Sequence, residues 1–283
     1  MTIKRHSAAG KFHSLRDELE GQVRVRTRHP VKDDELQDRI ESGTLNQPFI
    51  IETEHERRLH FTLASSQSRM LIDSPNVLVD SYTQKMMAFL LFNPSPGRIL
   101  MIGLGGGSLA KFCYHELPKA DITVVEISPD VIALRRDFLI PDDDHRFRVI
   151  QQDGAEFITH CDRQFDVILV DAFDPDGIAL SLPSLNFYNH AYKRLARQGV
   201  LVMNLCGDDE RYPPNLSSLM TAFKSRPLVV TVQGSNNQLA FAFKQCVAPS
   251  MSTEMVNRAT ELKSVFKLQF PRYLKRLCQA QKL

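Results

Sequence analysis

Short runs of apolar and β-branched residues, separated by polar residues, mark the first part of the chain after residue 47. The runs lie roughly ten residues apart, at 49–53, 59–63 and 70–72. Runs of this length and spacing are typical of antiparallel strands. We therefore predict a small antiparallel β-domain at 47–80, preceded by a mostly polar N-terminal arm at 1–46.

From residue 82 onward the pattern changes to apolar strands that alternate with helices. Strands are predicted at 98–102, 122–125, 147–150, 165–170, 199–204, 228–232 and 239–243, and helices at 82–92, 108–115, 129–138, 155–159 and 184–197. Such alternation indicates an α/β fold, with a parallel sheet that helices cover on both faces. We predict a Rossmann-like doubly wound sheet over 81–248 and a helical C-terminal segment at 249–283. Ligands bind such sheets at the carboxyl ends of the strands.

The composition fits a folded chain and excludes some classes of partner. Hydrophobic residues make up 43% of the chain, and 35 Lys and Arg against 33 Asp and Glu give a net charge of +2. A nucleic-acid binder needs more basic clustering than this, and no apolar run reaches the length of about 18 residues that spans a membrane. The five cysteines form no C-x-x-C pair. We expect a cytoplasmic protein with no nucleic-acid partner, no membrane contact and no bound metal.

A glycine-rich turn, Gly103-Leu104-Gly105-Gly106-Gly107-Ser108, follows the first strand of the predicted sheet. Residues without Cβ let the chain turn sharply and let a ligand approach the backbone, while the next helix offers free N–H groups. Gly103, Gly105 and Gly107 are therefore candidate ligand-binding residues. A tight turn without a ligand is the alternative interpretation.

Polar residues also follow the second and third strands. Glu126 lies 23 residues after Gly103, where a carboxylate takes the ribose hydroxyls of an adenosine. Asp153-Gly154 follow the third strand, where the carboxylate can accept a hydrogen bond from the adenine amine and the glycine frees a backbone N–H. A surface glutamate and an ordinary Asp-Gly turn are the alternatives.

The fourth strand ends in Asp171-Ala172-Phe173-Asp174-Pro175. Two carboxylates at the end of an apolar strand are costly to place unless a cation lies against them. We therefore expect a cationic ligand. For Asp174 the alternative is a turn cap before the proline.

With these strand ends, the chain resembles the spermidine synthase (polyamine aminopropyltransferase) family, a branch of the class I S-adenosylmethionine-dependent methyltransferase fold. The likeness runs over 48–245 and includes Tyr82, Val-Val-Glu-Ile at 124–127, Phe187-Tyr188 and Gly199-Val200. It implies aminopropyl transfer from decarboxylated S-adenosylmethionine to putrescine or a similar polyamine, which releases methylthioadenosine. The implied co-substrate is not tightly bound, and the implied assembly is a homodimer or homotetramer through the N-terminal β-segment.

The resemblance places Asp171, Asp174 and Tyr82 in the catalytic site. The attacking amine must be uncharged, so one carboxylate accepts its proton while another holds the cationic far end of the diamine. We expect Asp174 to be the base and Asp171 the anchor. The loop from Pro175 to about Leu185 matches a lid that closes over the acceptor.

Three departures from the family pattern leave the donor open. Gly106 stands where the family has an aspartate that holds the aminopropyl amine, Thr83-Gln84 replace His-Glu, and Asp-Ala-Phe-Asp replaces Asp-Ser-Ser-Asp. The alternatives are a methyltransferase that uses intact S-adenosylmethionine and a non-catalytic homologue that binds an adenosyl ligand. A nicotinamide-dependent oxidoreductase fits less well, because it has no use for Asp153 or for the pair at 171 and 174.

Overall fold

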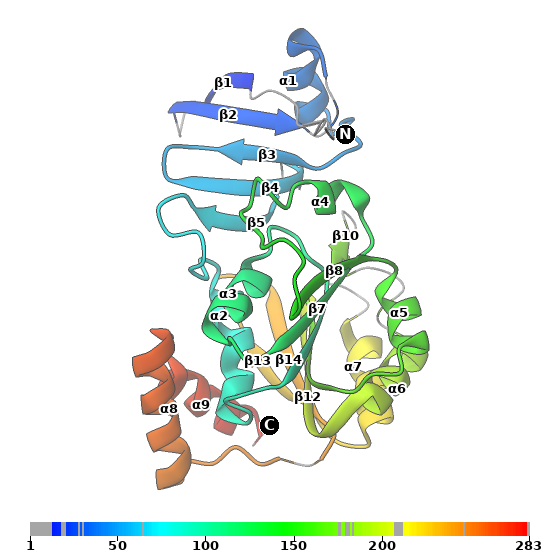
Figure 1. The fold of residues 1–283 in the computed structure, drawn as a ribbon, viewed down its shortest axis with the longest axis vertical. Coiled ribbons are helices and arrows are strands. Elements are labelled where there is room, and N and C mark those ends of the chain that lie inside the picture. The colour runs from blue at the N-terminus through cyan, green and yellow to red at the C-terminus, as the bar shows by residue number, and fades with distance from the viewer. Residues whose placement is uncertain are drawn as a thin grey trace.

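The computed structural model is organised around two sheets. It describes residues 13–17, 21–27, 29, 31–63, 65–174, 177–178, 182, 184–206, 212–245 and 247–281. One is an N-terminal sheet of five strands and the other a larger sheet of seven. Figure 1 shows the N-terminal sheet stacked beyond one end of the larger sheet, which has helices on both sides. Among the described helices, none is both long and apolar enough to cross a bilayer.

The N-terminal sheet is antiparallel and ordered β1-β2-β3-β4-β5. Its strands are β1 (His13–Asp17), β2 (Gly21–Thr27), β3 (Phe49–Glu52), β4 (Glu56–Thr62) and β5 (Ser65–Leu71), and α1 (Asp33–Glu41) lies between β2 and β3 in sequence. The sheet thus extends into the segment 1–46 that we expected to be an arm. The arginines of β2 hid its alternation: Val25 and Thr27 are buried, whereas Arg26 between them is partly exposed.

The larger sheet is ordered β13-β14-β12-β9-β6-β7-β8. Its strands are β6 (Arg98–Ile102), β7 (Asp121–Glu126), β8 (Phe147–Gln151), β9 (Phe165–Val170), β12 (Leu195–Cys206), β13 (Leu228–Thr231) and β14 (Asn237–Phe243). The predicted α/β, Rossmann-like architecture is confirmed. The sheet is parallel except at one edge, where β14 is antiparallel to both β12 and β13. Residues 232–236 between β13 and β14 are too few for a crossover, which needs about a dozen.

The helices of this part follow the predicted order. They are α2 (Ser81–Met86), the 3₁₀ helix η1 (Met87–Leu91), α3 (Ser108–Glu116), α4 (Pro129–Ala133), α5 (Gly154–His160), α6 (Leu185–Arg194), α7 (Tyr212–Phe223), α8 (Thr253–Phe266) and α9 (Phe270–Ala280). Helix α4 ends five residues before its predicted end at Phe138. The chain leaves the helix there, and Phe138 and Ile140 pack against Gly106 and Gly107 of the glycine turn.

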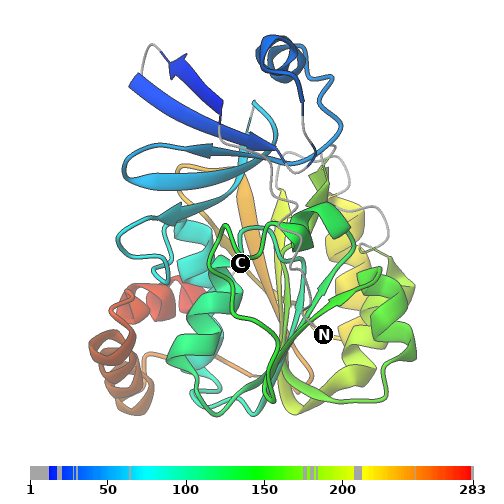
Figure 2. The ribbon, with the colours of Figure 1, turned by 45° about the horizontal axis from the view of Figure 1, so that its top comes forward.

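Two apolar layers cover the faces of the larger sheet. Ile99 and Met101 of β6 face the layer that contains η1, α3, α8 and α9, whereas Leu100 and Ile102 face the layer of α5, α6 and α7. Figure 2 shows both helix layers beside the twisted sheet. Because both faces are filled, the strand ends near the N-terminal sheet are left to form a site.

Acidic side chains cover the outer edge of β8, which pairs only with β7 among the described strands. Asp143 accepts the Val149 N–H at 3.2 Å, and Asp144 accepts the N–H groups of Arg146 and Phe147 at 2.8 Å each. The hydrogen bonds that Asp144 accepts, that from the Arg146 N–H foremost, lower its pKa. The acidic run at 142–144 therefore caps an exposed strand edge.

Candidate active site

A pocket opens where the carboxyl ends of β6, β7 and β9 and the turn after β8 meet strands β4 and β5. Seven of the nine predicted site residues line it: Tyr82, Gly103, Gly105, Glu126, Asp153, Gly154 and Asp171. The N-terminal sheet supplies Phe61, Gln67 and Ser68. No sequence motif pointed to these three, because a single residue in a strand does not reveal which distant element its side chain faces.

The glycines of the turn have different roles. Gly103 has φ +97°, and a Cβ there would lie 2.2 Å from the carbonyl oxygen of Asp171, so its absence lets the ends of β6 and β9 approach. Gly105, with φ +52°, lines the pocket. Gly107 has φ +68° and is not among the described lining residues; a Cβ there would lie 2.4 Å from Ile140 Cγ1. Gly107 therefore serves packing.

Space around Gly106 is already filled. A Cβ there would lie 2.7 Å from Ser68 Oγ and 3.0 Å from Phe138 Cδ1. The buried Ser68 hydroxyl lies 3.3 Å from that of Ser108, and both serines line the pocket. An aspartate at position 106 would require these neighbours to shift, so two hydroxyls occupy this part of the wall instead of a carboxylate.

Backbone N–H groups hold the Glu126 carboxylate. Oε2 accepts the Leu104 N–H and Oε1 accepts the Ser128 N–H, both at 2.8 Å. Burial raises the pKa of Glu126, and these bonds oppose the rise. Since each carboxylate oxygen has a second lone pair, the group can still accept two hydroxyl donors from the pocket.

Asp153 both caps a helix and lines the pocket. Its Oδ1 accepts the N–H groups of Ala155 and Glu156 at 2.7 and 2.9 Å, and among the described residues Oδ2 remains for a ligand. A Cβ at Gly154 would lie 2.4 Å from Ile102 Cγ2, so this glycine allows α5 to approach β6. Asp153 thus caps α5 and lines the pocket at the same time.

Two side chains hold the Asp171 carboxylate. Tyr82 Oη donates to Oδ2 at 3.1 Å and Asn204 Nδ2 donates to Oδ1 at 2.9 Å. Burial raises the pKa of Asp171, the two donors oppose the rise, and the charge of Asp80 adds to it. Burial likewise raises the pKa of Tyr82, so its hydroxyl remains a donor. Asn204 was missed from the sequence, where it is one polar residue in an apolar strand.

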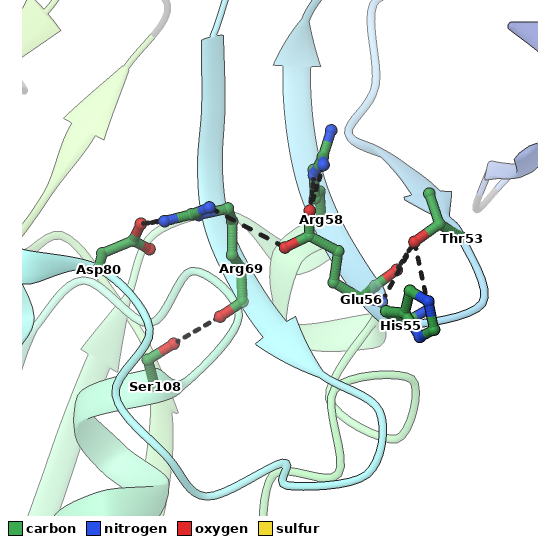
Figure 3. Close-up of polar contacts among 7 residues, drawn as sticks. All are labelled: Thr53, His55, Glu56, Arg58, Arg69, Asp80 and Ser108. Carbon is green, nitrogen blue, oxygen red and sulfur yellow. Dashed lines mark hydrogen bonds and ion pairs between the residues drawn. The ribbon is translucent and has the colours of Figure 1, made fainter. Parts of the chain in front are cut away.

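An ion pair connects the N-terminal sheet to the start of α2. Arg69 of β5 donates through Nε and Nη2 to Asp80 Oδ1, both at 2.8 Å, and the Ser108 hydroxyl donates to the Arg69 carbonyl at 3.4 Å. Figure 3 shows Arg69 between Asp80 and Glu56, with Ser108 below it. Strand β5 is thereby fixed to the first turns of α2, which carries Tyr82, and of α3.

The second acidic residue after β9 is placed only by its backbone. Asp174 ends the short strand β10 (Phe173–Asp174), which pairs with β11 (Gly177–Ile178). The Asp174 side chain lies outside the described residues, as do 175, 176, 179–181 and 183 of the predicted lid. Phe173 and Leu182, on either side of this segment, line the pocket.

One exposed apolar residue in the pocket was also absent from the predicted site. Ile127 is 61% exposed and lines the pocket directly after Glu126. A large apolar side chain that is exposed inside a pocket suits a flat apolar surface of a ligand. The signal in the sequence was the final position of Val-Val-Glu-Ile.

The sequence comparisons point to one family, and the solved structures share the fold. Residues 79–208 match the model of the spermine/spermidine synthase domain. The chain is 36% identical over 224 residues to a polyamine aminopropyltransferase of Chromobacterium violaceum, which covers 79% of this chain and 86% of that protein. A probable spermidine synthase from Corynebacterium glutamicum shares the fold, with a TM-score of 0.63, 20% identity and coverage of 76% and 84% of the two chains. Human methyltransferase-like protein 13 in complex with SAH also shares it, with a TM-score of 0.56, 22% identity and coverage of 71% and 93%.

Proposed function

Because this chain belongs to the family of polyamine aminopropyltransferases, we propose that it transfers the aminopropyl group of decarboxylated S-adenosylmethionine to putrescine or a similar polyamine. The products are methylthioadenosine and the lengthened amine. One observation carries the proposal: a single pocket is lined by the backbone-held carboxylates Glu126 and Asp153 and by the half-buried, hydrogen-bonded pair Asp171 and Tyr82.

The donor nucleoside is assigned to the residues at the ends of β6 and β7 and after β8. Glu126 accepts the two ribose hydroxyls, and Asp153 Oδ2 accepts the adenine amine. Ile127 packs against the adenine ring, and the turn at Gly103 and Gly105 brings the backbone close to the sulfonium. This assignment uses the free lone pairs and the exposed apolar surface of these side chains.

The amine acceptor is assigned to the carboxylates after β9. Its nitrogen attacks the carbon beside the sulfonium sulfur, the N–C bond forms, and the C–S bond breaks with its electron pair returning to sulfur. The nitrogen also releases a proton to a carboxylate. From the sequence we predicted Asp174 as this base, and that assignment stays a prediction. Asp171 is the alternative base: its carboxylate lines the pocket in contact with Tyr82, and burial raises its pKa, as suits a carboxylate that accepts a proton.

The remaining acceleration comes from placement. Holding the amine and the sulfonium carbon in contact makes the reaction effectively unimolecular, which contributes up to about 7–11 kcal/mol in well-oriented systems. The second carboxylate and the Tyr82 hydroxyl bind the cationic part of the acceptor.

Methyl transfer from intact S-adenosylmethionine is the second candidate. It is favoured by the wall at Gly106, where Ser68 and Ser108 present hydroxyls in place of a carboxylate. A neutral wall does not repel a donor that carries its own carboxylate, whereas a carboxylate there would do so.

The test is a product assay with both donors. The purified protein is incubated with putrescine and either decarboxylated or intact S-adenosylmethionine, and methylthioadenosine and S-adenosylhomocysteine are quantified. Methylthioadenosine formation that depends on putrescine supports the proposal. Formation of S-adenosylhomocysteine alone would refute aminopropyl transfer and support methyl transfer as the function.

Assembly and location stay predictions. A homodimer or homotetramer through the N-terminal sheet places β1, the described end of that sheet, near the contact. Size-exclusion chromatography with light scattering measures the assembly, and fractionation of the source cells tests the cytoplasmic location.

A further inference from the structure

Asn204 lies beside Asp171 at the carboxyl end of the larger sheet. Strands β12 and β9 are parallel neighbours, with Met203 opposite Val170, so the next residues along each strand are adjacent. The amide Nδ2 of Asn204 donates to Asp171 Oδ1 at 2.9 Å. Asn204 is therefore in direct contact with a carboxylate that lines the pocket.

The other polar atom of the Asn204 amide, Oδ1, is buried without a hydrogen-bond partner among the described residues. The residue as a whole is 3% exposed. Its neighbours in β12, from Val200 to Leu205, are otherwise apolar and buried. A buried carbonyl oxygen without a partner is destabilising, and an apolar side chain of similar volume would avoid that cost. The contact with Asp171 is the physical reason for an amide at this position.

A carboxylate that accepts a proton needs different hydrogen-bond partners before and after the transfer. Before the transfer, Asp171 only accepts hydrogen bonds; afterwards, the protonated oxygen must donate one. An amide can do both, because rotation by half a turn exchanges Nδ2 with Oδ1 without moving the backbone. The hydroxyl of Tyr82, on the other carboxylate oxygen, can also donate or accept.

We propose that Asn204 is a positioning residue that serves Asp171 in both states: Nδ2 donates to the ionised carboxylate, and after proton transfer Oδ1 accepts its O–H. The inference rests on the proposed function, in which Asp171 takes the proton of the amine. The bond to the ionised carboxylate is charge-assisted and therefore the stronger of the two, so Asn204 holds the pKa of Asp171 below the value that burial alone would give. Asn204 therefore sets the pH range in which the acceptor site works, without touching the acceptor.

Among the described side chains, the titratable groups that contact Asp171, act on it or line the same pocket are Tyr82, Asp80, Glu126 and Asp153, and the Asp174 side chain lies outside the described residues. Tyr82 of α2 contacts it, and Asp80, which precedes α2, acts on it from a distance while paired with Arg69 of β5. Glu126 after β7 lines the same pocket. None of these contacts changes in a variant of Asn204, so a shift of the pH profile in such a variant reports on the amide.

The experiment compares the pH dependence of turnover in Asn204→Leu and Asn204→Asp with the wild type. The leucine variant removes the Nδ2 donor, so the midpoint of the rising limb of kcat/KM should move up by about one pH unit. The aspartate variant keeps the size but adds a like charge, so it should move the midpoint further. Asn215→Leu is the matched control, because Asn215 of α7 is also 3% exposed and also has one amide atom, here Nδ2, without a described partner. It should leave the midpoint unchanged.

An independent measurement does not depend on turnover. The Asp171 carboxyl is titrated by ¹³C NMR in the wild type and both Asn204 variants, with Asp171→Asn used to assign the signal. A higher titration midpoint in both variants supports the inference even if the wild type fails to make methylthioadenosine, which would refute only the proposed function. Unchanged midpoints in folded Asn204→Asp, by NMR and by turnover, overturn the inference. If Asn204→Leu does not fold, as its thermal melt would show, the isosteric aspartate variant decides.

Discussion

Glu126 and Asp153 are held by backbone N–H groups, whereas Asp171 is held by the side chains of Tyr82 and Asn204. We call the first two the backbone-held pair and the last three the side-chain cluster. Backbone donors come with the turn itself, so the backbone-held pair is disturbed only by changing its own residues or the glycines that shape the turn. The side-chain cluster can be retuned by single substitutions, so it is the place where specificity and pH response can vary within one fold.

Gly103→Ala is the change with the largest expected effect, because it would disturb both the turn that shapes the backbone-held pair and the strand end that carries Asp171. The new Cβ would lie 2.2 Å from the Asp171 carbonyl oxygen, at a residue whose φ is +97°. We expect a loss of about 3 kcal/mol or more in the free energy of unfolding, and a fall of about 100-fold or more in turnover, because displacing the reacting groups by an ångström has that effect. Urea unfolding and the methylthioadenosine assay measure the two losses.

The control for this variant is Gly43→Ala. Gly43 also has a positive φ of +69°, but a Cβ there would meet no described atom within 4 Å. Only the cost of the left-handed backbone remains, about 1–2 kcal/mol, and turnover should be unchanged. Equal losses in the two variants would mean that the close approach of β6 to β9 is unimportant.

Lys111→Met tests a buried side chain that holds the segment packed against the glycine turn. Lys111 of α3 is fully buried and donates to the Phe138 carbonyl at 2.8 Å. Burial, with the charge of Arg57 adding to it, lowers the pKa of Lys111 to about 8. Between this value and the unfolded value of about 10.4, the unfolded chain binds one more proton than the folded chain, so the free energy of unfolding rises with pH.

The rise should reach up to about 3 kcal/mol between pH 7.5 and 10.5 in the wild type, on top of the contributions of other groups. In Lys111→Met this component should be absent, so the variant gains on the wild type at low pH and loses that advantage at high pH. Urea unfolding of both proteins at several pH values measures the difference. Parallel pH curves for the two proteins would exclude a buried, titrating lysine.

Glu126→Gln tests the backbone-held pair without moving the turn. An amide at this position places an NH₂ group against a backbone N–H and offers one fewer acceptor to the ribose. Since hydrogen bonds to charged groups contribute about 1.5–3 kcal/mol, we expect methylthioadenosine to bind about 10- to 100-fold more weakly by calorimetry. Glu156→Gln, at an exposed residue outside the described lining, is the control. Unaltered affinity in the Glu126 variant would remove the ribose assignment.

Asp80→Asn has the smallest expected effect and sharpens the description of the side-chain cluster. The charge of Asp80 raises the pKa of Asp171, so removing it should lower that pKa, by less than about one unit because the charge acts at a distance and is partly screened. The rising limb of kcat/KM against pH should therefore move to lower pH, opposite in sign to Asn204→Leu. A shift to higher pH would show that Arg69, left without its partner, displaces the cluster instead.

The residues at the strand ends could be predicted because the signal is local. The turn at 103–108, Glu126 and Asp153-Gly154 each combine a strand, a turn and one polar residue within a few positions, and parallel strands bring such ends to one edge. Contacts across the sheets leave no local signal. Ser68 and Asn204 appear in the sequence as isolated polar residues in strands, and only the fold shows that one fills the space beside Gly106 and the other contacts Asp171.

The N-terminal strands were missed for a related reason. In β2 the arginines dominate the composition, although Val25 and Thr27 follow the period of a half-buried strand. The hairpin of β13 and β14 was predicted as two strands but not as antiparallel, because strand direction depends on the length of the connection and not on the strand residues.

The carboxylates on the outer edge of β8 bear on how the protein is handled in solution. Asp143 and Asp144 occupy N–H groups that would otherwise be free to recruit a strand from a second molecule. Hydrogen bonds lower the pKa of Asp144, so the part of this protection that Asp144 provides should persist through mild acidification and fail only in strong acid. Purification or crystallisation at low pH would then favour fibrous or amorphous precipitate growing from this edge, and buffers near neutrality would avoid it.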